Sequence, residues 1–260
     1  MSVPVPLFHR DFGGTGAPLI ILHGMLGSSR NWQAAGKDLA DAGWHVMALD
    51  LRNHGNSPHA AEMSYPDLVD DVLHWLDQQG LDRVHLLGHS MGGKTAMLLA
   101  CRQPERVSRL TVVDIAPKSY RWAAHRMEFA AMHALDLEHL ASRAEAELQM
   151  ENRVSDWAMR KFLTTNLERT EAGTWRWIVN LPAISGAIAE LEGNPLLPAD
   201  RYGGPTRFII GGRSNYVVPA QDTAVIQQHF PAAEILTVAA AGHNPHFEQR
   251  AAFVAAFQRA

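Results

Sequence analysis

The sequence has almost no cysteine, no long apolar run and no concentration of basic residues. Its 260 residues include one cysteine, Cys101, so the chain cannot form an internal disulfide, which suits a reducing compartment. No apolar run reaches the roughly 18 residues that a membrane helix needs. The formal net charge is −4 without a basic stripe, which argues against nucleic acid as the main partner. Because the first residues lack the features of a signal peptide, we expect a soluble cytoplasmic protein that binds a small molecule.

Apolar segments of strand length recur along the first half of the chain and return near its end. They alternate with segments whose apolar residues have helical spacing. This alternation is typical of a parallel sheet covered by helices on both faces. The expected strands cover residues 18–24, 44–55, 83–90, 107–117, 205–212 and 234–242, and the expected helices cover 31–43, 64–80, 92–104 and 245–259.

The alternation stops between residues 118 and 202, where the sequence indicates helices throughout. This stretch also holds four of the seven tryptophans. We therefore expect an α/β core formed by residues 1–117 and 203–260, with residues 118–202 inserted as a helical cap. Aromatic and apolar side chains of such a cap would shape an acyl pocket; those proposed for its lining are Trp122, Phe129 and Trp177.

The stretch "LLGHSMGGKT" (86–95) places Ser90 between two glycines, after an expected strand and before an expected helix. In that context G-x-S-x-G indicates a nucleophile elbow, a sharp turn that exposes the serine at the carboxyl edge of the sheet. Gly88 and Gly92 leave the space that side chains would fill in so tight a turn. Ser90 is therefore the predicted nucleophile.

A serine hydroxyl needs a base to act as a nucleophile near neutral pH. His243 follows the last expected strand and precedes the closing helix, so it lies at the same sheet edge as Ser90. His246 is the nearest competitor, but it falls in or beside that helix. His243, His246 and Glu248 also form a conceivable metal set, which no other ligand cluster in the sequence supports.

The base needs an acid that orients it, and two aspartates compete for this role. In the commonest arrangement of such folds the acid follows the strand before the histidine, but Ser214 or Asn215 occupies that position here. Asp114 ends the strand that follows the nucleophile's helix, and a buried carboxylate there would need a partner such as His243. We predict Asp114 as the acid, with Asp222 as the alternative.

Acyl transfer also needs backbone N–H groups that stabilise the oxyanion. The residue after the nucleophile, Met91, is one predicted donor. Met25, in the loop "HGMLGSS" after the first apolar strand, is the other. His23 shapes that loop and is a predicted substrate-binding residue. His54, in "DLRNHGNSPH" (50–59), is interpreted as a residue that holds its own loop, with substrate contact as the alternative.

Together these motifs identify a resemblance. "LHGMLGSSRNW", "LDLRNHGNSPH", "LLGHSMGGKTAM", "VVDIAP" and "GGRSNYV" resemble one branch of the α/β-hydrolase superfamily, which includes small bacterial esterases and mitochondrial relatives. The resemblance covers nearly the whole chain. It implies an α/β-hydrolase fold and esterase activity on short acyl esters and on some thioesters such as acyl-CoA. It also implies an acid on the strand after the nucleophile. The segment "GHNPHFEQ" departs from the family pattern after the histidine.

The expected function is therefore cleavage of carboxylic esters of short to medium acyl chains, or of acyl-CoA thioesters, by Ser90, His243 and Asp114 without metal or organic cofactor. Perhydrolases, C–C bond hydrolases and hydroxynitrile lyases use the same triad, so they remain alternatives. A non-catalytic binding protein is a further alternative from a different class. A nucleotide-binding function is disfavoured, because the glycine-rich stretch 13–18 precedes a strand and lacks the P-loop lysine. The oligomeric state does not follow from the sequence.

Overall fold

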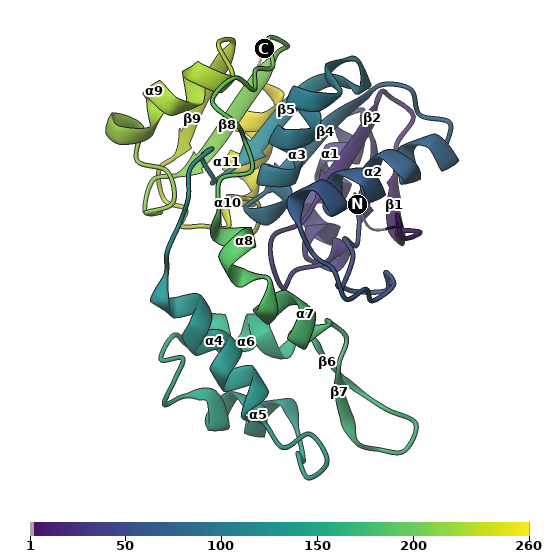
Figure 1. The fold of residues 1–260 in the computed structure, drawn as a ribbon, viewed down its shortest axis with the longest axis vertical. Coiled ribbons are helices and arrows are strands. Elements are labelled where there is room, and N and C mark those ends of the chain that lie inside the picture. Colours follow the sequence, from purple (N-terminus) through teal and green to yellow (C-terminus); the bar gives the residue numbers. More distant parts are fainter. Residues whose placement is uncertain (1–2, 260) are drawn as a thin grey trace.

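The structure, a computed structural model, describes residues 3–259. Seven strands form one sheet in the order β1-β3-β2-β4-β5-β8-β9 (Figure 1). Only β1 runs antiparallel to its neighbour, and all other neighbouring pairs are parallel. The mostly parallel sheet expected from the sequence is thus confirmed. The strands are β1 (His9–Gly13), β2 (Pro18–Leu22), β3 (His45–Leu49), β4 (Val84–His89), β5 (Val107–Val113), β8 (Thr206–Gly211) and β9 (Ala233–Val238).

Helices cover both faces of the sheet, because successive strand side chains point to opposite sides. In β2, Ile20 and Leu22 join one apolar cluster with residues of the helices on one face, while Leu19 and Ile21 join a second cluster with residues of the helices on the other face. The first face carries α2 (Tyr65–Gln78), α3 (Met91–Arg102) and α9 (Pro219–His229), and the second carries α1 (Gln33–Asp41) and α11 (Arg250–Gln258). Two short 3₁₀ helices cover Ser29–Trp32 and Pro104–Arg106.

Local signals in the sequence explain where α2 begins. The Ser64 hydroxyl accepts a hydrogen bond from the Asp67 N–H, and the Asp67 carboxylate accepts one from the Ser64 N–H, which completes a capping box. Pro66 lies in the first turn, where its missing N–H costs no helical hydrogen bond. The predicted start of this helix is confirmed.

Residues 118–202 are not wholly helical, which corrects the sequence-based expectation. They form α4 (Ala123–His133), α5 (Arg143–Met150), α6 (Trp157–Thr164), α7 (Leu181–Gly186) and α8 (Ile188–Glu192), but also a hairpin of β6 (Leu167–Arg169) and β7 (Trp175–Trp177). The turn of this hairpin contains Gly173 at φ +86°, a conformation that glycine adopts readily. The "WRW" of β7 alternates with period two, which favours a strand over the helix that we expected.

Two other expectations need correction. The closing helix is interrupted: α10 (Pro245–Glu248) ends at Gln249, whose φ of −137° and ψ of 54° are not helical, and α11 begins directly after it. The edge strand β1 was not expected. It pairs with β3 in antiparallel orientation and takes the edge position at that end of the sheet.

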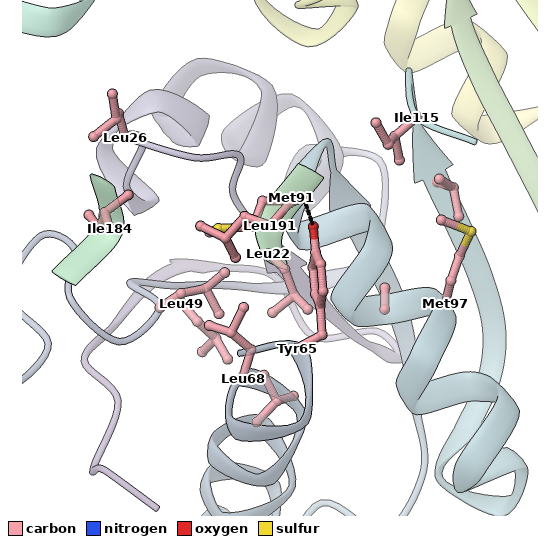
Figure 2. Close-up of a cluster of buried hydrophobic side chains, with 14 of the residues drawn as sticks. Leu22, Leu26, Leu49, Tyr65, Leu68, Met91, Met97, Ile115, Ile184 and Leu191 are labelled. Carbon is pink, nitrogen blue, oxygen red and sulfur yellow. Dashed lines mark hydrogen bonds between the residues drawn. The ribbon is translucent and has the colours of Figure 1, made fainter. Parts of the chain in front are cut away.

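The helical segment, residues 118–202, lies to one side of the sheet in Figure 1, where α4, α5, α6 and the hairpin are grouped. Its boundaries as a separate cap stay a prediction. Figure 2 shows that Ile184 of α7 and Leu191 of α8 share one apolar cluster with Leu22, Tyr65 and Met91 of the core. The end of the segment therefore packs on the core through buried apolar contacts. Among residues 3–259, the helices are too short or too polar to span a bilayer.

Buried neutral histidines predict a loss of stability in acid. His85 of β4 is stacked on Phe257, and burial lowers its pKa to about 3. The unfolded chain takes up this proton near pH 6.5, so the native state loses about 1.4 kcal/mol per pH unit below that value.

We expect wild type to lose about 2 kcal/mol more than His85→Leu when the pH falls from 6.5 to 5. Urea unfolding of both proteins at each pH measures the difference. Equal losses in the two proteins would contradict the assignment of a neutral buried imidazole to His85.

Candidate active site

Ser90 occupies a strained turn between β4 and α3. Its φ of 51° and ψ of −117° lie outside the regions that most side-chain-bearing residues adopt. A Cβ on Gly88 would lie 2.2 Å from the carbonyl oxygen of Gly92, and a Cβ on Gly92 would lie 2.3 Å from that of Leu22. Both glycines are therefore required by backbone packing. The geometry is that of a nucleophile elbow.

Asp114 and His243 lie in direct contact at the same edge of the sheet. Asp114 directly follows β5 and has no exposed surface and a φ of 49°. Its Oδ1 accepts a hydrogen bond from the Gly211 N–H at 2.9 Å, and its Oδ2 accepts one from His243 Nδ1 at 2.8 Å and another from the Ser214 hydroxyl. Because Nδ1 of His243 donates to a carboxylate, its Nε2 keeps a lone pair for proton transfer.

The alternative acid, Asp222, is engaged elsewhere. Its two carboxylate oxygens accept hydrogen bonds from Lys118 Nζ at 2.8 and 2.7 Å, and the Val218 N–H donates to it at 2.8 Å. Ser214, at the position that commonly carries the acid, instead donates its hydroxyl to Asp114. The loop after β8 thus supports the carboxylate of β5.

The loop that contains Met25 lies against the elbow. The Gly92 N–H donates to the His23 carbonyl at 3.1 Å, and a Cβ on Gly24 would lie 3.3 Å from the Cβ of Ser90. Within residues 3–259, neither the Met25 nor the Met91 backbone N–H has a hydrogen-bond acceptor. The Met91 side chain points into the apolar cluster of Figure 2, so only its backbone faces the site edge.

Two buried histidines fasten this loop to the loop after β3. The Leu51 N–H donates to His23 Nε2 at 3.0 Å, and the Leu26 N–H donates to His54 Nε2 at 3.1 Å. Each ring uses its Nδ1–H to donate to a nearby carbonyl, of Gly24 for His23 and of Arg52 for His54. Both imidazoles must therefore be neutral. Burial lowers the pKa of His23 and brings that of His54 to about 3.

All ring nitrogens of this histidine pair are thus bound to backbone groups. This arrangement fits the interpretation that His54 holds its loop. His23 is 1% exposed, and a substrate contact by its side chain stays a prediction.

A second pair of histidines surrounds His243. His89, directly before the nucleophile, donates from Nε2 to the His243 carbonyl at 2.8 Å. Burial, with the nearby His243 and His246, lowers the pKa of His89 well below its usual value. His246, the competing base, is stacked on Trp32 at 3.9 Å, and burial lowers its pKa to about 3. In the part of the chain that the structure describes, no three metal-ligating side chains converge.

The residues predicted to line an acyl pocket lie in different surroundings. Trp122 is stacked on Tyr216, with ring centroids 4.4 Å apart, and Tyr216 is in turn stacked on His243 at 3.6 Å. Phe129 is buried in the main apolar cluster, and Trp177 packs against that cluster from β7. Sequence reasoning missed Tyr216, although the motif "GGRSNYV" contains it.

Comparisons with known proteins agree with this geometry. The sequence matches the alpha/beta hydrolase fold family over residues 17–249. It is 38% identical to the mouse sn-1-specific diacylglycerol lipase ABHD11 over 254 residues, 95% of this chain and 82% of that protein. It is 32% identical to esterase YbfF of Escherichia coli over 243 residues, which are 94% of this chain and 92% of that protein.

The solved structure of a marine microorganism esterase matches with a TM-score of 0.92 and 36% identity, covering 96% of this chain and 97% of that one. The relatives and the structural neighbour agree on both fold and general chemistry. The chain therefore belongs to the α/β-hydrolase fold family and is a hydrolase with esterases and a lipase among its relatives.

Proposed function

We propose that the protein hydrolyses carboxylic esters of short to medium acyl chains through an acyl-enzyme formed on Ser90. The observation that carries the proposal is the hydrogen bond from His243 Nδ1 to the buried carboxylate of Asp114, at the sheet edge where Ser90 stands in its elbow. The relatives are named esterase and diacylglycerol lipase, names that describe cleavage of carboxylic esters. Thioesters such as acyl-CoA offer the same carbonyl chemistry.

The mechanism follows from the roles of the three side chains. His243 Nε2 takes the hydroxyl proton as Ser90 Oγ forms a bond to the ester carbonyl carbon. The imidazolium then returns this proton to the departing alcohol as the carbon–oxygen bond of the ester breaks. Water, deprotonated by His243, attacks the acyl-enzyme and releases the acid and the free serine. Asp114 stabilises the imidazolium in both halves of the reaction.

The backbone N–H groups of Met25 and Met91 would stabilise the oxyanion of each tetrahedral intermediate. Their lack of protein acceptors within residues 3–259 supports this role. Because two neutral histidines hold the Met25 loop, the donor is preorganised and needs no rearrangement when charge develops. None of these steps uses a metal ion or an organic cofactor.

The first prediction separates the two candidate acids. The substrates are p-nitrophenyl esters from acetyl to palmitoyl, with the matching acyl-CoAs alongside. We expect the hydrolysis rate of Ser90→Ala to fall to the background rate without enzyme. Asp114→Asn should lower kcat by roughly a thousandfold or more, because His243 loses its orienting carboxylate. Asp222→Asn is the matched control, a buried carboxylate paired with Lys118, and should stay within a few-fold of wild type. A wild type that cleaves none of these substrates would contradict the proposed function.

The second prediction concerns a pair of exchanges that removes the carboxylate from position 114 and places one at position 214. His243 Nδ1 and the Ser214 hydroxyl both donate to Asp114 Oδ2, so a carboxylate at position 214 would lie within reach of the same imidazole. We expect Asp114→Ser to be nearly inactive, and the added change Ser214→Asp to raise kcat at least about tenfold. Asn215→Asp in the same background is the control and should recover nothing. Equal recovery by both exchanges would argue that general charge, not position, matters.

The third prediction tests the oxyanion loop through its backbone. A methyl group on Gly24 would lie 2.7 Å from His89 Nδ1 and 3.3 Å from the Cβ of Ser90, so Gly24→Ala must change the spacing between the loop that carries Met25 and the elbow with its buried His89. We expect a loss of about 10²–10³ in kcat, the usual cost of one oxyanion donor. Gly203→Ala is the control, because a Cβ there meets nothing within 4 Å. Ester assays and thermal melts of both variants separate activity from stability, and full activity of Gly24→Ala would oppose this role for the loop.

A further inference from the structure

The ring of Tyr216 lies flat on the imidazole of His243. Their centroids are 3.6 Å apart and the rings are inclined by 14°. The hydrogen bond to Asp114 fixes Nδ1 at one point, but the imidazole can still tilt about that point. A stacked ring fixes the plane of the imidazole as well, and with it the direction in which Nε2 points. Asp114 and Tyr216 together therefore restrain both the position of Nδ1 and the plane of the proposed base.

Tyr216 is itself held by the chain that enters the helical segment, residues 120–126. Trp122 stacks on its ring with centroids 4.4 Å apart. The phenol oxygen of Tyr216 shares a hydrogen bond with His125 Nε2 at 3.3 Å, and the Tyr120 hydroxyl donates to the Tyr216 carbonyl at 2.9 Å. Three side chains of this entry thus contact a residue that comes from the loop after β8.

Residues 120–126 are held in turn by Glu192, the last residue of α8. Its carboxylate accepts hydrogen bonds from the Trp122 N–H at 3.2 Å, from His125 Nδ1 at 3.0 Å and from Arg126 at 2.9 Å. Its backbone carbonyl accepts one from the Tyr120 N–H at 2.7 Å. Burial acts to raise the pKa of Glu192, but these donors outweigh it and lower that pKa. A residue at the exit of the segment therefore holds the residues at its entry.

This exit is anchored on the nucleophile's own helix. Lys94, four residues after Ser90 and 1% exposed, donates from Nζ to the carbonyls of Glu192 at 3.1 Å and Gly193 at 2.5 Å. The Tyr65 hydroxyl donates to the Leu191 carbonyl at 2.6 Å (Figure 2). The amino group of Lys94 lies at the carboxyl end of α8, where it donates to carbonyls that have no helical partner. The position of Glu192 is thus tied to the elbow.

We propose that Tyr216 is a positioning residue for His243, and that the junction of the helical segment, formed by residues 120–126 and Glu192, holds Tyr216 in place. This inference rests on the proposed function, since it assigns His243 as the base. It makes the orientation of His243 depend on the contacts between the helical segment and Tyr216. An opening of the junction would remove the contacts of Trp122, His125 and Tyr120 with Tyr216, and would loosen the ring that lies on the imidazole of His243.

The test compares a variant that keeps the ring with one that removes it. Tyr216→Phe keeps the stack and loses only the bond to His125, so we expect kcat within about threefold of wild type. Tyr216→Leu should lower kcat about 10- to 100-fold with little change in KM, because a misdirected base slows chemistry more than binding. Steady-state kinetics on the best p-nitrophenyl ester measures both constants.

A second readout does not depend on turnover. The proton between His243 Nδ1 and Asp114 gives a low-field ¹H NMR signal when the pair is ordered. We expect this signal in wild type and Tyr216→Phe, and its broadening or loss in Tyr216→Leu. Tyr202→Leu is the matched control, because Tyr202 is also buried and bonds the carbonyl of Val107, at the opposite end of β5 from Asp114. It should retain both the signal and kcat.

Glu192→Gln tests the junction without touching Tyr216 or His243. The amide N–H₂ that this exchange introduces cannot accept a hydrogen bond from Arg126. We therefore expect a several-fold loss of kcat and a broadened low-field signal. Wild-type kcat and an intact signal in Tyr216→Leu would overturn the proposal that Tyr216 positions His243. The same result in Glu192→Gln would overturn the claim that the junction holds Tyr216 in place. If the proposed function failed instead, wild type itself would be inactive, while the NMR comparison would still report on the Asp114–His243 pair.

Discussion

The carboxylate of Asp114 has no exposed surface, and much of the site follows from the need to satisfy it. A buried carboxylate without partners costs several kcal/mol, so its acceptors must meet donors. Those donors come from Gly211 at the end of β8, from Ser214 in the loop after it and from His243 after β9. One charge at the end of β5 thus gathers the loops of the two following strands, and the native order of the sheet brings them within reach.

A second constraint is space around Ser90. Gly88, Gly92 and Gly24 are each placed where a Cβ would collide with a neighbouring loop or side chain. The elbow and the Met25 loop can approach only because these side chains are missing. Within these buried loops, the neutral imidazoles of His23 and His54 supply the acceptors that the backbone N–H groups of Leu51 and Leu26 need.

Sequence patterns predicted the features that depend on local chemistry. The period of the apolar residues indicated the parallel sheet, and the flanking glycines identified the elbow at Ser90. The absence of a carboxylate at Ser214 and Asn215 directed attention to Asp114. Among contacts between distant segments, the pairing of Asp114 with His243 followed from the order of the strands, but contacts made by residues without a chemical signature did not. Tyr216 meets His243 and Trp122 only after the fold has formed. The sequence of the short β6–β7 hairpin is also compatible with a helix, so its local pattern did not decide between the two.

The position of the proposed acid, Asp114, explains why the loop after β8 has a different task. If the carboxylate lay on that loop, the neighbouring residues of the loop would have to stabilise its charge. Here the charge lies on β5, and the loop instead contributes the hydroxyl of Ser214 and, two residues later, the ring of Tyr216. The Tyr216 N–H also donates to the Ser214 hydroxyl at 3.1 Å, so one compact turn supports both the carboxylate of Asp114 and the imidazole of His243. Because Trp122 covers the outer face of Tyr216, this turn is also where the helical segment meets the proposed base.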